Sequence, residues 1–161
     1  MKEFNETQRF TQWWLWLILL GVWSSMVYSI ITAPPQTDSA VYVSFGIGIL
    51  LPLLFWQMKL TTRITAEGIY VRFFPFHFKE KFFAWDTLSA SYVRAYSPLM
   101  EYGGWGIKYS FKGNGLVYNT AGNVGLQLYF KEGDPVLIGT QKGEEIKQVL
   151  AALGHLNESV K

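Results

Sequence analysis

Residues 13–31 read WWLWLILLGVWSSMVYSII, and this run decides the architecture because it holds nineteen residues without a charged side chain. A helix needs roughly twenty apolar residues to cross the hydrocarbon core of a bilayer, so the run predicts a first membrane span. Trp13, Trp14 and Trp16 gather at one end of it, as aromatic side chains do at membrane interfaces. The alternative is a cleaved secretory signal, whose apolar core is usually shorter and ends at small residues.

A second apolar segment, residues 40–57, contains AVYVSFGIGILLPLLFW and predicts a second span of near-minimal length. Pro52 lies inside it, which membrane helices tolerate. The connecting residues 32–39, TAPPQTDS, contain no Lys or Arg, whereas basic residues flank the two spans on the other side: Lys2, Arg9, Lys59 and Arg63. The positive-inside bias therefore predicts an extracytoplasmic loop at 32–39 and cytoplasmic N- and C-termini. The reversed orientation would place every flanking basic residue on the wrong side.

Residues 1–12 form a short cytoplasmic segment ahead of the first span. Phe4, Phe10 and Trp14, with Arg9, fit a short helix lying in the membrane interface. A frayed polar terminus is the alternative.

Residues 58–161 change to short runs rich in β-branched and aromatic residues, separated by Gly, Pro, Asn and Asp. This pattern predicts a β-rich domain of about seven strands, mostly antiparallel. The expected strands are Leu60–Thr65, Gly68–Phe74, Lys79–Ala84, Ser89–Ala95, Gly106–Phe111, Leu116–Tyr118 with Val124–Lys131, and Pro135–Thr140.

A helix should close the domain, because Ile146, Val149, Leu150 and Leu153 recur at helical spacing and Gly154 is placed to end it. The fold class expected is thus membrane-anchored α+β: a two-helix transmembrane hairpin followed by an antiparallel β-barrel or sandwich that the C-terminal helix caps. The chain has no cysteine, which excludes disulfides and thiolate chemistry, and its small positive charge does not indicate nucleic-acid binding.

Several blocks of sequence resemble a small uncharacterised family of bacterial two-span membrane proteins with a C-terminal pleckstrin-homology-like (PH-like) domain. The blocks are QRFTQWWLW (8–16), GIYVRFFPFH (68–77), YSPLMEYGGWGIKY (96–109), YNTAGNVGLQL (118–128) and LIGTQKGEE (137–145). The resemblance implies a PH-like fold and a place in the bacterial inner membrane as a multi-pass protein. It implies no activity. The basic cluster with which some PH domains bind inositol phosphates is not present, so we do not expect phosphoinositide binding.

The loop from Arg94 to Trp105 is the strongest candidate for binding a partner. Its candidate contact residues are Arg94, Tyr96, Glu101, Tyr102, Gly103, Gly104 and Trp105, which combine aromatic contact area with glycine backbone freedom. The alternative is a structured corner in which Trp105 is buried in the barrel, Arg94 pairs with Glu101 or stacks on a tyrosine, and the glycines make the turn.

Arg72, Lys79 and Lys81 form a second candidate site, a basic strand face turned toward anionic lipid headgroups. A plain solvated strand face is the alternative. No catalytic, cofactor or metal-binding constellation is recognisable, and His77 and His155 lack ligands at metal-binding spacing.

We therefore expect a membrane-tethered, non-catalytic module that binds a protein or peptide, a second copy of the chain included, at the cytoplasmic face. An anionic-lipid-contacting or envelope-stress component is the second reading. An enzyme with dispersed residues such as Asp86, Arg94 and Glu101 is the third.

Overall fold

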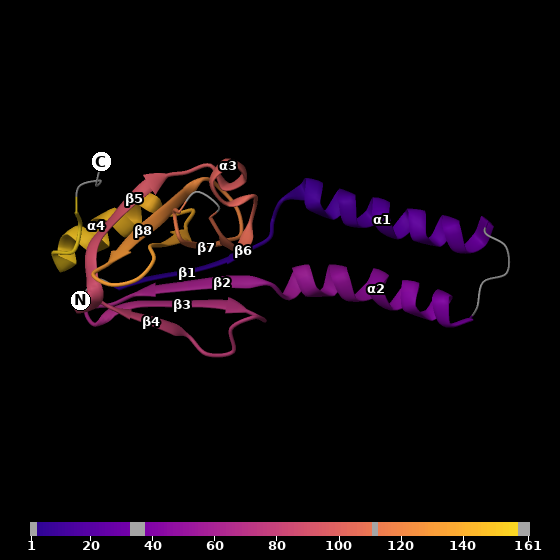
Figure 1. Cartoon of the computed structure of the whole chain (residues 1–161), viewed down its shortest axis with the longest axis horizontal. Coiled ribbons are helices and arrows are strands. Elements are labelled where there is room, and N and C mark those ends of the chain that lie inside the picture. Colours follow the sequence, from indigo (N-terminus) through magenta and orange to yellow (C-terminus); the bar gives the residue numbers. More distant parts are fainter. Residues whose placement is uncertain (1–2, 33–37, 111–112, 158–161) are drawn as a thin grey trace. The chain divides into compact units, whose positions relative to one another are not determined.

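The computed structural model describes residues 3–32, 38–110 and 113–157 and divides into two compact units (Figure 1). One unit is helical and runs from Phe10 to Met58. The other joins the segment that ends at Arg9 to the chain from Lys59 onward. The β unit therefore includes residues that precede the helices in the sequence as well as those that follow them. The expected domain, residues 58–161, did not contain the preceding segment.

The helical unit consists of α1 (Trp13–Thr32) and α2 (Asp38–Gln57). The two helices pack antiparallel, since Phe10 contacts Phe55 edge to face at 5.6 Å while Trp23 lies against Gly48. A Cβ on Gly48 would stand 2.8 Å from Trp23 Cδ1, so the missing side chain is what lets the indole approach. Among the described helices, α1 alone is long and apolar enough to cross a membrane; the apolar part of α2, Val41–Gln57, is shorter.

The first sheet contains β1 (Phe4–Arg9), β2 (Lys59–Ile64), β3 (Gly68–Phe74) and β4 (Lys81–Ala84), all antiparallel and in that spatial order. The residues before α1 are thus neither an interfacial helix nor a frayed terminus. They pair with the strand that follows α2, from Phe4 opposite Ile64 to Arg9 opposite Lys59.

β1 also reaches the second sheet, through polar side chains on its buried face. The Glu6 carboxylate accepts hydrogen bonds from the Thr140 hydroxyl (2.6 Å) and the Gln141 backbone N–H (3.0 Å). Gln8 donates to the Gly139 carbonyl (2.7 Å) and accepts from the Thr120 hydroxyl (3.3 Å). Because both polar side chains are satisfied, their burial is tolerated.

The second sheet has the spatial order β5 (Leu88–Ala95), β8 (Val124–Phe130), β9 (Val136–Gly139), β7 (Leu116–Asn119) and β6 (Gly106–Tyr109). Its pairs are antiparallel except β7 and β9, which run parallel. The structure describes nine strands where about seven were expected.

Of the barrel and the sandwich that were expected, the closed barrel is not formed by the described strands. A 3₁₀ turn at Trp85–Thr87 separates β4 from β5, and both sheets end in edge strands: β1 and β4 in one, β5 and β6 in the other. The sheets meet through side chains instead, as where Phe83 lies 5.4 Å from Phe130. The fold is therefore α+β with two open sheets, one antiparallel and one mixed.

The predicted C-terminal helix is confirmed as α4 (Gly143–Leu153). It buries Ile146, Val149 and Leu150 and ends where Gly154 adopts a left-handed conformation (φ 74°). The chain beyond it returns to β5, where the Ser91 N–H donates to the Asn157 side chain at 2.8 Å.

Candidate functional site

The segment from Arg94 to Trp105 folds into a corner built around a short helix, α3 (Pro98–Tyr102). Ser97 caps this helix by accepting a hydrogen bond from the Met100 N–H, and Pro98 occupies the first turn, where its missing N–H costs nothing. Gly103 ends the helix in a left-handed conformation (φ 70°), which a residue with a Cβ adopts only with strain.

Arg94 and Glu101 hold the corner to β5 and β8. Their closest atoms, Nη2 and Oε2, are 2.8 Å apart, and the two side chains are only 24% and 23% exposed. Glu101 Oε1 also accepts from the Ser97 N–H, while Arg94 Nε donates to Gln127. Burial opposes the charged guanidinium, but the hydrogen bond and charge of Glu101 outweigh it and raise the pKa of Arg94. The pairing expected for a structured corner is confirmed.

Two tyrosines of the corner, Tyr96 and Tyr102, pack with Val117 and Leu137 in a small buried hydrophobic cluster. The Tyr102 hydroxyl donates to the Asn114 carbonyl (3.2 Å), and burial raises the pKa of Tyr102 to about 12. The Tyr96 hydroxyl accepts from Asn119 (2.9 Å). Trp105 is half-buried rather than enclosed in a barrel, with its indole N–H 3.4 Å from the Gly122 carbonyl. These residues stabilise the corner, and most of their contact area faces the protein.

The outward face of the corner carries two residues that sequence reasoning missed. Leu99 and Met100 on α3 are 62% and 71% exposed. The signal that could have found them is Ser97-Pro98, a helix start, because a short helix capped in a loop turns some of its side chains outward.

β6 forms an edge of the second sheet. The Ser110 hydroxyl, just after β6, donates to the Glu101 carbonyl at 2.8 Å and so ties the strand to the helix. Tyr109 on β6 is exposed and donates its hydroxyl hydrogen to the Asp134 carboxylate. The corner therefore presents an exposed apolar helix face, and its helix is hydrogen-bonded to the residue that follows the edge strand β6.

The three basic residues of the second candidate site do not share a face. Lys81 lies opposite Val71 on the inner side of the sheet, and its ammonium donates to the Tyr118 hydroxyl at 2.8 Å. Arg72 follows Val71 and so points to the outer side, while Lys79 is exposed in the turn before β4. A continuous basic strand face is therefore not formed.

The acidic residue considered for an enzyme is also separated from the corner. Asp86 lies in the 3₁₀ turn before β5, and Arg94 lies near the other end of that strand. At about 3.3 Å per residue the two are roughly 20 Å apart. Among residues 3–32, 38–110 and 113–157, no three His, Asp or Glu side chains gather in a way that could hold a metal ion.

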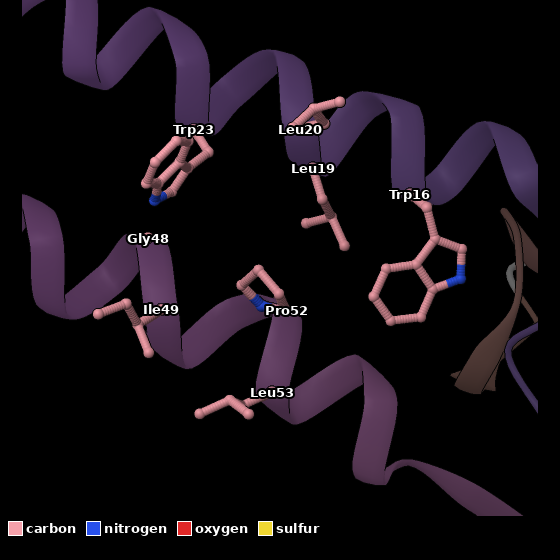
Figure 2. A pocket seen from close by; sticks show the side chains of 8 residues that line it. All are labelled: Trp16, Leu19, Leu20, Trp23, Gly48, Ile49, Pro52 and Leu53. Carbon is pink, nitrogen blue, oxygen red and sulfur yellow. The ribbon is translucent and has the colours of Figure 1, made fainter.

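The helical unit contains a cleft of ≈ 530 Å³ between α1 and α2 (Figure 2). Trp16, Leu19 and Trp23 reach into it from α1, opposite Gly48 and Pro52 of α2. Because its lining residues carry no charge, the cleft offers contact for hydrocarbon but no charged group to orient a polar ligand.

Replacing Glu101 by Gln should destabilise the β unit by about 1–3 kcal/mol, because Arg94 loses its charged partner in a partly buried site. Equilibrium unfolding of the detergent-solubilised chain measures this. The matched control is Glu144→Gln, which breaks an ion pair with Lys147 in which the Glu144 side chain is 83% exposed. We expect that control to change stability by less than about 0.5 kcal/mol. Equal effects of the two substitutions would contradict a structural role for the Arg94–Glu101 pair.

No protein-family model matches the sequence, and no curated protein matches it significantly. The resemblance to two-span proteins with a PH-like domain thus stays a prediction from the sequence, and the function is argued from the geometry above.

Proposed function

We propose that the chain is a membrane-tethered, non-catalytic binding module: α1 and α2 anchor it, and the β unit binds a protein or peptide at the membrane surface. The single observation that carries the binding role is the exposed apolar face of α3, a helix whose Glu101 carbonyl accepts a hydrogen bond from Ser110 at the end of the edge strand β6.

Anchoring by two spans is supported by the pairing of β1 with β2. The chain leaves the sheet at Arg9 and returns to it at Lys59, and these two residues pair. This pairing favours both ends of the helical hairpin on one side of a membrane that α1 crosses, and so supports α2 as the returning span. The short apolar part of α2 suffices if the bilayer thins locally or flanking residues snorkel.

The orientation we propose has both termini in the cytoplasm, at the inner membrane of a bacterium. It rests on the basic residues that flank the helices and on the absence of Lys and Arg from residues 32–39. For the β unit we propose a PH-like fold. The antiparallel strands and the closing helix α4 support it, and the parallel contact of β7 with β9 is a departure.

The binding surface would act by strand addition. An extended peptide that pairs with the outer edge of β6 would gain main-chain hydrogen bonds, and Leu99 and Met100 would contact its side chains. Both residues are held on a helix that Arg94, Glu101 and Tyr102 fix in place, so little conformational entropy is lost on binding.

The orientation is testable by cysteine labelling, because the natural chain has no cysteine. In intact bacterial cells a membrane-impermeant maleimide should label Ser39→Cys, near the start of α2, and should not label Glu67→Cys, in the turn between β2 and β3. Both positions are exposed. Labelling of Glu67→Cys alone would reverse the orientation, and labelling of both in intact cells would contradict a membrane-crossing hairpin.

The binding surface is testable by substituting its two apolar residues. Leu99→Asn with Met100→Gln should abolish partner recovery after mild crosslinking in cells, because it removes the apolar contacts and leaves the capping and ion-pair residues in place. The matched control is Leu156→Asn, an exposed leucine after α4. Equal recovery with the double variant and the control, or no partner with the natural chain, would contradict the proposed role of α3 and β6.

A further inference from the structure

The turn between β3 and β4, residues 75–80, exposes two large aromatic side chains. Phe76 and Phe78 are 56% and 81% exposed. Each touches a phenylalanine of β3 only at its edge or at a tilt: Phe76 with Phe73 at 6.1 Å, and Phe78 with Phe74 at 6.4 Å between ring centroids. The two exposed phenylalanines, one beside the inward-facing Phe73 and the other beside the outward-facing Phe74, are the apolar patch of this turn.

The residue between them points inward and adds no charge to the patch. The His77 ring lies edge to face against Tyr118 at 5.5 Å, and its Nδ1 is buried without a hydrogen bond among the described residues. Burial, with a smaller effect of the Lys81 charge, lowers the pKa of His77, so the imidazole is neutral at physiological pH.

The strand register places this turn at a particular end of the sheet. Arg9 pairs with Lys59, and Lys59 pairs with Phe74, so the three residues lie side by side at one end. From that same end the chain continues into the helices: α1 begins at Trp13 and α2 ends at Gln57. The turn at the other end of β3, which joins it to β2, contains Thr65-Ala66-Glu67 and no large apolar residue.

Basic side chains accompany the patch. Lys59 Nζ lies 5.7 Å from the centre of the Phe74 ring, and Lys79, directly after Phe78, is exposed. Phenylalanines with lysines beside them suit the membrane interface, where rings enter the acyl boundary and ammonium groups remain among lipid phosphates.

We propose that the β3–β4 turn inserts Phe76 and Phe78 into the interfacial layer of the bilayer that the helices cross, and so docks the β unit on lipid. The occupant of the patch is the lipid surface itself. Three observations carry this inference: the apolar rings, the lysines beside them, and the position of the turn at the end of the sheet where the chain leaves at Arg9 and returns at Lys59. The inference rests on the proposed membrane anchoring.

Spin labels on single cysteines in the full chain test the inference, with the protein reconstituted into vesicles of phosphatidylcholine and phosphatidylglycerol. The three labelled variants are Phe78→Cys, Glu67→Cys in the turn at the opposite end of β3, and Ile18→Cys in α1. Relaxation by oxygen, which partitions into lipid, is compared with relaxation by a water-soluble nickel chelate. We expect the oxygen-to-nickel ratio at position 78 to exceed that at position 67 several-fold, and Phe76→Ser to lower it.

The outcomes separate the two claims. The docking inference is overturned if the nickel chelate relaxes the label at position 78 as strongly as the label at position 67. If the label at position 18 still reports lipid in that case, the anchor stays intact. Shielding of position 78 from both reagents means that protein covers the turn, which also overturns it. A water-exposed label at position 18 refutes the anchor and the inference together.

Discussion

The pairing of β1 with β2 is the constraint on which the rest of the structure depends. It joins residues 4–9 to residues 59–64 across the whole helical unit, in an unbroken antiparallel register. Closing so long a connection costs conformational entropy, and two helices packed antiparallel reduce that cost by bringing their ends together. On the same strand, Glu6 accepts a hydrogen bond from Thr140 and Gln8 donates one to the Gly139 carbonyl. Without β1, these buried polar groups near the second sheet would lose their hydrogen-bond partners. The β unit therefore depends on residues from both sides of the helical segment in the sequence.

The elements that could be predicted from the sequence are those with a local periodic signal. The helical stripe of Ile146, Val149 and Leu150 and the glycine that ends α4 predicted that helix correctly, and the β-rich run Val124–Lys131 predicted β8. β1 was missed because two of its three buried side chains, Glu6 and Gln8, are polar. Alternation of Phe, Glu and Gln does not indicate a buried face until the partners that satisfy the polar groups are known.

The sheet topology and the candidate surface depend on contacts between residues distant in sequence. A parallel pair such as β7 and β9 leaves no turn signal, so hairpin chemistry predicted an all-antiparallel barrel or sandwich and not a mixed second sheet. In the corner, the charged and aromatic residues were the predicted partner contacts, yet Arg94 is paired with Glu101, and Tyr96 and Tyr102 are buried in the protein. The large exposed side chains are those of Leu99 and Met100, whose apolar character alone would have suggested the core.

The most direct test of the account is a disulfide across the β1–β2 pair in the full chain. Thr7 and Thr61 lie opposite each other with their hydroxyls 3.4 Å apart on the outer face, and the natural chain has no cysteine. Under mild oxidation in membranes, Thr7→Cys with Thr61→Cys should form an intramolecular disulfide and lose both reactive thiols. The control is Thr7→Cys with Arg72→Cys. Arg72 on β3 pairs with Thr61 on β2, so it lies two strands away from Thr7 on β1. Two strand spacings are roughly 9.6 Å, which is too far for a disulfide. Thiols in the first pair that stay as reactive as those in the control would contradict the pairing and, with it, the shared side of the two helix ends.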